Sequence, residues 1–377
     1  MQCVHDTGQN GDTGQNGREF FERFYVKVNQ NRIPVSGAIE LTSRCNLRCI
    51  HCYITCDHRC GRNSPAELSA RRWMDLIDQI ADAGCLFLLI TGGECLLRSD
   101  FPEIYRHACK KGLLVTVFTN GTNITEKVID VFEKYPPHAV EISLYGATAS
   151  TYEEITHVAG SFEKCMQGIS RLTDRGVHLK LKTMLMRVNM AELEDMKHLA
   201  EEFGAAFRFD AMILPRMDGD PAPLKYRVRP EQVVAKEFAD QKRAKQQHDF
   251  YYRMNRKDIS TDLYVCGAGM NMFHIDAFGI MRPCMMVPGA GQNLRNRSFD
   301  QAWHSDTFTQ FSRKEKAPVK CRSCDEKMLC GYCPGFFKLE TGSETAASNY
   351  LCEIGRMRKQ AILNFHTKEV IHDQPIP

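Results

Sequence analysis

The sequence predicts an α/β fold, in which a parallel sheet is followed by a smaller cysteine-rich region. Between residues 34 and 213, short apolar segments of strand length alternate with amphipathic segments of helical period, an order typical of βα units joined by right-handed crossovers. From Cys266 onward the chain changes to short segments rich in Gly, Cys and Met, which indicates organisation by metal. The 377 residues are enough for two or three domains.

The composition excludes several broad classes of protein. Apolar residues make up 43% of the chain and charged residues 25%, with a formal net charge of +3, which is ordinary for a globular protein. This balance offers no basic surface for nucleic acid, and no apolar run approaches the ~18 residues that span a bilayer. No secretory signal opens the chain. We therefore expect a cytoplasmic protein with no nucleic-acid or membrane partner.

The first elements in chain order are a tail and six strands. Residues 1–33 are expected to be a disordered, low-complexity tail, because residues 6–17 repeat one polar hexapeptide that cannot build a core. Each strand is a short apolar run bounded by turn residues. The runs cover residues 35–41, 86–91, 113–119, 139–143, 177–185 and 207–213.

Helices are predicted between these strands, where apolar residues recur at i, i+3, i+4 and i+7. The stripes consist of Trp73, Leu76, Ile77 and Ile80, then Phe101, Ile104, Tyr105 and Ala108, then Leu193, Met196, Ala200 and Phe203. Helical patterns also fit residues 125–135, 162–175 and 191–203. In such folds the chemistry lies at the carboxyl ends of the strands.

A domain division follows from the change in pattern along the chain. Four prolines between residues 214 and 230 mark a linker, and residues 231–250 are predicted to form a polar helix. The predicted parts are a tail (1–33), the sheet domain (34–213), a linker and helix (214–261), the cysteine-rich domain (262–356) and a C-terminal helix or tail (357–377).

Cysteine is the most informative residue type in this chain. There are 17 cysteines, five of them between residues 45 and 60 and seven between residues 266 and 352. A cytosolic chain keeps its thiols reduced, so these clusters are not expected to be disulfides. Clustered cysteines in such a protein more often bind metal.

The first cluster follows the first strand directly. Cys45, Cys49 and Cys52 are separated by three and by two residues. Three thiolates on one short loop can ligate three irons of a 4Fe–4S cube and leave the fourth iron without a protein ligand. A zinc site is the alternative, and its fourth ligand would be His51, Cys56 or Cys60.

Polar residues follow the next three strands. Thr91-Gly92-Gly93-Glu94 ends the second strand, where the glycines let the backbone approach a ligand closely and the carboxylate can accept hydrogen bonds from an ammonium group. Asn120 ends the third strand and Ser143 ends the fourth. Each of these would pass as an ordinary strand end by itself.

The cysteine loop and the Gly-Gly-Glu motif together resemble the radical S-adenosylmethionine (SAM) superfamily over about residues 35–213. The resemblance implies a partial (β/α)6 barrel, in which the methionine part of SAM chelates the open iron. Two positions depart from the family's usual pattern, because His51 stands where an aromatic residue near the adenine is usual and Cys95 replaces a proline. The cofactor-binding residues that the resemblance implies are His51, Gly92, Gly93, Glu94, Asn120 and Ser143.

The later cysteines resemble the SPASM extension of radical SAM enzymes, which carries two auxiliary 4Fe–4S clusters. The family pattern often has three residues between the last close pair, whereas two separate Cys330 from Cys333. The resemblance implies one cluster on Cys321, Cys324, Cys330 and Cys352, and another on Cys266, Cys284 and Cys333. The second set lacks a fourth cysteine, so we expect either an open iron that binds substrate or a ligand of another kind. Two zinc sites would fit seven cysteines poorly.

The function that the resemblance implies is an oxidoreductase with SAM and three 4Fe–4S clusters as cofactors. The cluster at the first loop would reduce SAM to a 5′-deoxyadenosyl radical, with electrons from a flavodoxin- or ferredoxin-type partner. The expected substrate is a ribosomally made peptide that is crosslinked, oxidised or epimerised at an unactivated carbon. Only ~34 residues precede the first strand, too few for a leader-binding domain. Either a separate leader-recognition protein serves instead, or the substrate has no leader.

Two alternatives stay open at this point. The enzyme could act on a small molecule, such as a sugar or a tetrapyrrole. It could also be an iron–sulfur or zinc protein without SAM chemistry.

The sequence defines hydrogen-atom donors and bases less well than it defines the cluster ligands. Cys56 and Cys95 are candidate hydrogen donors for an epimerisation, since they lie near the loop and the Gly-Gly-Glu motif. Met285 follows Cys284 where sulfatase maturases place an Asp base, which argues against that subfamily. The remaining candidate bases are Asp210, Asp218, His274 and Asp276.

Overall fold

The computed structural model describes residues 15–54, 66–254, 260–287, 289, 291–311 and 316–372. The chain divides into two compact units. The barrel unit comprises Thr7–Tyr226 and Gly267–Ser312, and the C-terminal unit comprises Arg227–Cys266 and Arg313–Pro377 together with Met1–Asp6.

One sheet forms the centre of the barrel unit. Its first six strands are parallel and follow one another in both sequence and space. They are β1 (Ser36–Glu40), β2 (Phe87–Thr91), β3 (Leu114–Thr119), β4 (Ala139–Ser143), β5 (Leu179–Met184) and β6 (Ala206–Asp210). Every predicted strand is present, which confirms the predicted fold class.

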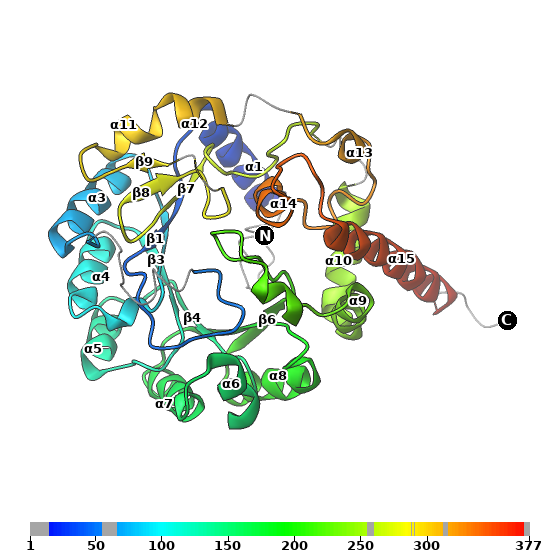
Figure 1. Ribbon diagram of the computed structural model, residues 1–377, viewed down its shortest axis with the longest axis horizontal. Helices are drawn as coiled ribbons and strands as arrows, with labels where there is room; N and C mark the ends of the chain where they lie inside the picture. Colours follow the sequence, from blue (N-terminus) through cyan, green and yellow to red (C-terminus); the bar gives the residue numbers. More distant parts are fainter. Residues whose placement is uncertain are drawn as a thin grey trace. The chain divides into compact units, whose positions relative to one another are not determined.

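Helices surround these strands on the outside, as Figure 1 shows. They are α3 (Ala70–Asp82), α4 (Phe101–Lys110), α5 (Glu126–Lys134), α6 (Ala149–Thr156), α7 (Ser161–Thr173) and α8 (Leu193–Glu202). The buried faces of α3 and α4 are the predicted stripes. Burial alternates along β2 and β5, because successive strand residues point to opposite faces of the sheet.

Three short turns of 3₁₀-helix connect these elements. They are η1 (Cys95–Leu97), η2 (Met190–Glu192) and η3 (Ala222–Tyr226).

The sheet extends beyond β1 into a region that the sequence assigned to the cysteine-rich domain. Here β7 (Met272–Ile275) pairs with β1 in parallel, and β8 (Ile280–Arg282) and β9 (Gln292–Asn293) follow in antiparallel. A Cβ at Gly37 would lie 2.1 Å from the Phe273 ring, so this glycine makes room for β7. Residues 267–312, including α11 (Phe299–Trp303) and α12 (Asp306–Phe311), therefore belong to the barrel unit.

The expectation of a disordered tail over residues 1–33 is wrong for its second half. Helix α1 covers Gln15–Gln30, and Val28 on it is 2% exposed. The polar repeat ends at Gly17, and an aromatic segment follows it; the rings of Phe20 and Phe24 stack one helical turn apart, as side chains at i and i+4 do on a helix. Residues 1–14 lie outside the described residues.

The C-terminal unit is helical. Its elements are α9 (Pro230–Ala239), α10 (Gln241–Met254), α13 (Val319–Arg322), α14 (Pro334–Thr341) and α15 (Asn349–His372). The single helix predicted over residues 231–250 is two helices, because Asp240 leaves the helical conformation and its carboxylate caps α10 by accepting from the Arg243 N–H at 3.0 Å. The predicted terminal segment from residue 357 is part of α15, which begins earlier.

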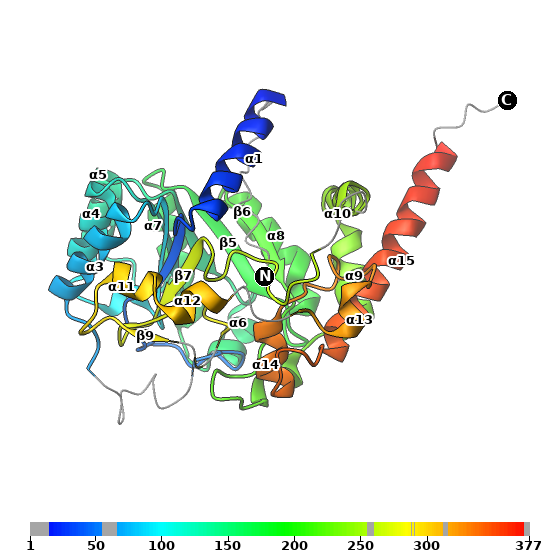
Figure 2. The same ribbon diagram turned by 90° about the horizontal axis from the view of Figure 1, so that it is seen from above.

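Helices α9, α10 and α15 pack together, as Figure 2 shows, and one carboxylate is buried between them. Glu237 on α9 is 1% exposed. Arg358 of α15 donates to both of its oxygens at 2.7 Å, and Arg243 of α10 donates at 3.0 Å. Burial raises the pKa of Glu237, but the two guanidinium groups outweigh it and leave the pKa lowered. No helix in the described ranges is long and apolar enough to cross a membrane.

Candidate active site

The three cysteines of the first cluster lie on the loop that leaves β1, and each is half-buried. The Sγ atom of Cys45 accepts from the Leu47 N–H at 3.4 Å and lies 3.9 Å from Asn120 Nδ2. Burial raises the pKa of Cys45 to about 11. Burial also raises the pKa of Tyr145, and the negative charges of Cys49, Cys52 and Cys45 add to this effect. Tyr145 therefore interacts electrostatically with all three predicted ligands.

The two glycines after β2 fix the chain that leads into this loop. The Gly93 N–H donates to the Thr42 carbonyl at 2.7 Å, and the Glu94 N–H donates to the Arg44 carbonyl at 2.8 Å. A Cβ at Gly92 would lie 2.4 Å from the Thr42 oxygen, and one at Gly93 would lie 2.3 Å from the Arg44 oxygen. We predicted that these glycines admit a ligand; the contacts that they make are with the backbone just before Cys45.

Glu94 joins the ends of β2 and β3. It is 1% exposed, and burial raises its pKa. Its Oε1 atom accepts from Thr119 Oγ1 at 2.8 Å and from the Leu96 N–H at 3.1 Å. Within the described ranges, the one donor to Oε2 is the Asn120 N–H, at 2.7 Å. Since a carboxylate has about four acceptor positions, Oε2 retains room for one more donor. This fits the ammonium group that we predicted Glu94 to hold.

A network of polar side chains connects the end of β3 to the cysteine loop. Asn120 Nδ2 donates to Asn46 Oδ1 at 2.9 Å, and Asn46 Nδ2 donates to Thr122 Oγ1 at 2.8 Å. Thr122 in turn donates to Asn120 Oδ1. The structure thus brings Asn120 to the predicted site and shows what holds it there.

His51 and Ser143 meet at Tyr145. The His51 and Tyr145 rings are 4.8 Å apart, and the Ser143 hydroxyl hydrogen-bonds to Tyr145. Burial lowers the pKa of His51 to about 4, so its ring is neutral at pH 7. Among the described residues, its buried Nδ1 atom has no hydrogen-bond partner. Three half-buried thiols, this unpartnered nitrogen and the vacant acceptor position of Glu94 together fit a cluster that carries SAM.

Sequence reasoning missed Tyr145 at this site. It stands two residues after Ser143, just past the end of β4. Its position beyond a strand end is the signal that could have identified it, because that edge of the sheet carries the chemistry in such folds.

A second polar group lies beside the loop. Tyr53 donates to Glu40 Oε1 at 3.2 Å, and His274 Nε2 lies 3.3 Å from the same oxygen. Burial raises the pKa of Glu40, but His274 and Tyr53 outweigh it and leave the pKa lowered. Of the four candidate bases, His274 is thus the one paired with a buried carboxylate near Cys52.

The other candidate bases are engaged in local structure. Asp276 pairs with Arg282 at 2.7 Å and accepts from the Ile280 N–H at 2.9 Å. Asp210 accepts from the Met212 N–H at 2.8 Å, and Asp218 accepts from the Asp220 N–H at 3.0 Å. These contacts stabilise turns.

The candidate hydrogen donors gain no support. Cys95 is fully buried, its Sγ atom donates to the Phe118 carbonyl at 3.4 Å, and burial raises its pKa well above the ordinary value. Its role as a hydrogen donor stays a prediction. Cys56 and Cys60 lie outside the described residues.

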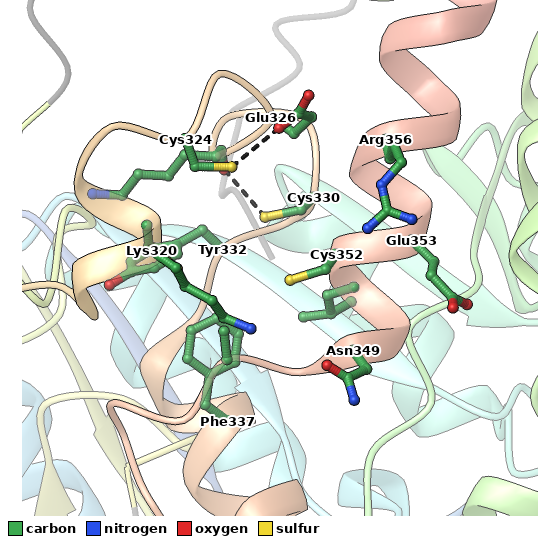
Figure 3. Close-up of a pocket in the computed structure, with 14 residues that line it drawn as sticks. Lys320, Cys324, Glu326, Cys330, Tyr332, Phe337, Asn349, Cys352, Glu353 and Arg356 are labelled. Carbon is green, nitrogen blue, oxygen red and sulfur yellow. Dashed lines mark hydrogen bonds between the residues drawn. The ribbon is translucent and has the colours of Figure 1, made fainter.

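The C-terminal unit contains a cavity of about 320 Å³. The predicted ligands Cys321, Cys324, Cys330 and Cys352 all line it, and Figure 3 shows the sulfur atoms of the last three turned toward a common space. Burial raises the pKa of Cys330 to about 12, and the charges of the other three cysteines add to this. A Cβ at Gly355 would lie 2.7 Å from Cys330 Cβ, so this glycine lets α15 approach. The donor set and the space fit a four-iron cube.

Lys327 also lines this cavity and was missed by sequence reasoning. It is 1% exposed. Its Nζ atom donates to the Ser260 carbonyl at 2.7 Å and lies 4.6 Å from the centre of the Tyr332 ring. Burial lowers its pKa, and the nearby thiolates oppose this shift. Nothing in the spacing of the cysteines distinguishes this lysine from the exposed Lys320.

The predicted ligands of the other auxiliary cluster are divided between the two units. Cys266 and Cys333 belong to the C-terminal unit, where both lie near Tyr264, and Cys284 belongs to the barrel unit. Their joint ligation of a cluster stays a prediction. In the described parts of the chain, no three Cys, His, Asp or Glu side chains converge closely enough to hold one metal ion. A 4Fe–4S cube does not need such convergence, because each thiolate binds a different iron atom of the cube.

Comparisons with known proteins point to one family. Residues 39–200 match the radical SAM superfamily, and residues 266–325 match the SPASM iron–sulfur cluster-binding domain. The AdoMet-dependent heme synthase of Methanosarcina barkeri is 28% identical over 78% of this chain and 90% of its own length. The mycofactocin maturase MftC of Mycobacterium ulcerans is 28% identical over 79% of this chain and 82% of its own. The structure of Streptococcus suis SuiB bound to precursor peptide SuiA has a TM-score of 0.68 at 17% identity, over 89% of this chain and 80% of SuiB.

Proposed function

Because the chain belongs to the radical SAM superfamily and carries a SPASM domain, we propose that it modifies a ribosomally made peptide at an unactivated carbon. The observation that carries this proposal is the group of three half-buried thiols at the carboxyl end of β1, held by the Gly92–Gly93 contacts and faced by Tyr145. When bound there, a four-iron cluster with SAM supplies a 5′-deoxyadenosyl radical that abstracts a hydrogen atom.

The residues of the barrel unit have distinct roles in this proposal. Cys45, Cys49 and Cys52 hold the cluster as thiolates. Glu94 accepts a hydrogen bond from the methionine ammonium of SAM through the free position on Oε2. His51 is neutral, so its unpartnered Nδ1 atom offers a hydrogen bond to the nucleoside without bringing a charge. Asn120 orients Cys45.

The cavity of the C-terminal unit is the proposed site of an auxiliary cluster. Its four cysteines come from α13, from α15 and from the segment between α13 and α14. Such a cluster can accept the electron that a substrate radical loses when the product is oxidised. We retain Cys266, Cys284 and Cys333 as proposed ligands of a third cluster, which would bring the total to about twelve irons per chain.

A peptide substrate is supported by the relatives. SuiB, which shares the fold, is described with its precursor peptide bound, and MftC is a maturase. The M. barkeri relative is a heme synthase at the same identity, and this favours a tetrapyrrole as the second candidate. A separate leader-recognition protein and a flavodoxin- or ferredoxin-type electron donor remain proposed partners.

One anaerobic experiment separates the two candidates. The reconstituted protein is incubated with SAM and a reductant, in one arm with short peptides encoded beside the gene and in another with a porphyrin precursor of heme. We expect 5′-deoxyadenosine in both arms and a mass change in a peptide only. Loss of two hydrogen atoms would indicate oxidation, and deuterium uptake from heavy water at constant connectivity would indicate epimerisation.

Two outcomes of this experiment would contradict the proposed function. A porphyrin that changes in mass, while every peptide stays unchanged, would replace the proposed function by the second candidate. A colourless, iron-free protein that forms no 5′-deoxyadenosine would contradict both.

A further inference from the structure

The buried ammonium of Lys327 is the feature that the proposed function does not use. This side chain is 1% exposed, although burying a charge is costly unless it is paired. No described carboxylate forms an ion pair with it within 4.0 Å; its contacts are the Ser260 carbonyl at 2.7 Å and the Tyr332 ring at 4.6 Å. Its charge interacts most strongly with Cys321 and next with the Asp262 carboxylate, which itself pairs with Lys316. Cys330 and Cys324 follow.

The surrounding contacts keep the ammonium in this position. The Lys327 N–H donates to the Cys324 carbonyl at 3.1 Å. The backbone of Lys327 is therefore tied to one of the predicted ligand residues by a peptide hydrogen bond that does not involve a thiol. The Ser260 carbonyl and the Tyr332 ring both attract a cation, so they hold the side chain beside the cavity and away from water.

We propose that Lys327 sets the reduction potential of the auxiliary cluster in this cavity, and so favours its role as an electron acceptor. The inference rests on the proposed function, because it requires that the four cysteines bind a cluster. Reduction adds one electron to a cluster that four thiolates already make negative. A buried positive charge stabilises the reduced form more than the oxidised form, because there is little water to screen the interaction. Charge and exposure around a cluster are established determinants of its potential.

Lys320 provides the matched control. It lines the same cavity, and its charge acts on Cys321 ahead of that of Lys327, but its side chain is exposed. Water and salt screen such a charge, so its removal is expected to move the potential much less. Comparing variants of the two lysines therefore separates the effect of burying a charge from the effect of carrying one.

The test uses the full chain with Cys45, Cys49 and Cys52 replaced by Ala, so that only auxiliary clusters remain. The potential of each cluster is measured by anaerobic redox titration followed by electron paramagnetic resonance. Lys327→Gln removes the charge but keeps a hydrogen-bond donor for Ser260, and Lys327→Met removes both. Lys327→Arg keeps the charge.

We expect Lys327→Gln and Lys327→Met to lower the midpoint potential of one cluster by a similar amount. At a fixed applied potential, the ratio of reduced to oxidised cluster should fall at least tenfold. For a one-electron couple, this corresponds to a midpoint potential lower by about 59 mV. Lys327→Arg and Lys320→Met are expected to stay near the starting value.

Three results would overturn the inference. The first is an unchanged midpoint potential in Lys327→Gln with its iron content intact. The second is an equal shift in Lys320→Met. The third is a shift confined to Lys327→Met, because this would assign the effect to the lost hydrogen bond. A parent protein that holds no iron would overturn the proposed function as well, so iron analysis separates the two failures.

Discussion

At the scale of single residues, the cysteines were predictable and their neighbours were not. Spacing alone predicted Cys45, Cys49 and Cys52 as one set, because three thiols on one short loop have few other uses. Tyr145 lies near the first set through tertiary packing, and only its position just beyond β4 marks it in the sequence. Lys327 stands between Cys324 and Cys330 in the sequence, but the burial of its ammonium is visible only in the fold. The sequence predicted that Gly93 allows a close approach of the backbone. Only the fold shows that the group approaching it is the backbone just before Cys45.

Cys49→Ala is expected to abolish the cleavage of SAM. The loop would keep two thiolates, which cannot hold a four-iron cube with one open iron, so about four irons per chain are lost. Iron analysis and the yield of 5′-deoxyadenosine measure both effects. Cys109→Ala, at a half-buried cysteine of α4, is the control and should leave both unchanged. Full cleavage by Cys49→Ala would exclude this loop as the site.

At the scale of elements, the alternation of apolar runs predicted all six parallel strands, because buried strands and amphipathic helices have different periods. The pairing of β7 with β1 was not predictable, since it joins segments more than 200 residues apart. The break between α9 and α10 was missed because Asp240 is a polar residue in a polar helix, and only its backbone conformation identifies it as a cap.

Gly93→Ala tests the junction between β2 and the cysteine loop. The new methyl group would meet two backbone oxygens, of Arg44 and Ser43, at 2.3 and 2.6 Å, and backbone cannot move aside as a flexible side chain can. We expect a loss of stability of about 1–3 kcal/mol and a larger loss of iron from the loop than from the C-terminal unit. Thermal unfolding and iron analysis measure these effects.

Gly204→Asn is the matched control. Gly204 has a φ of +62° with nothing near its Cβ position, and Asn tolerates this conformation. If both variants retained all of their iron, the packing of Gly93 would not matter to the loop.

Glu237→Gln tests the packing of α9, α10 and α15. The change would leave the Arg358 guanidinium without its charged partner, and the expected loss of stability is about 2–4 kcal/mol. Because the folded-state pKa of Glu237 is lowered, its stabilisation is present above the unfolded value of about 4.3. It is lost as the pH falls through the folded-state pKa.

Urea denaturation at several pH values measures this effect. The wild-type protein should lose stability more steeply below about pH 4 than the Gln variant. Parallel pH profiles would show that Glu237 does not contribute through its charge.

At the scale of the whole molecule, the two units carry separable parts of the proposed reaction. The thiols that we propose to hold the SAM-binding cluster belong to the barrel unit, and the cavity lined by four cysteines belongs to the C-terminal unit. The sequence predicted both sets of ligands, but it placed the boundary at residue 262, because composition cannot show that residues 267–312 join the sheet.

Cys324→Ala is therefore expected to separate cleavage from product formation. The variant should lose about four irons per chain and retain the initial formation of 5′-deoxyadenosine, while its yield of modified peptide falls by about tenfold or more. Both products are counted in the same anaerobic reaction. An equal fall in both would mean that the C-terminal unit is needed for cleavage itself.

The backbone contacts between Gly92–Gly93 and the chain before Cys45 have a consequence for the lifetime of the enzyme. They consist of peptide groups and do not involve iron, so the frame of the loop is a property of the folded polypeptide. Assembly can then proceed in two stages, with synthesis of the chain first and delivery of the metal afterwards. A molecule that has lost its cube would keep these backbone contacts, and repair would require iron, sulfide and a reductant for any oxidised thiols.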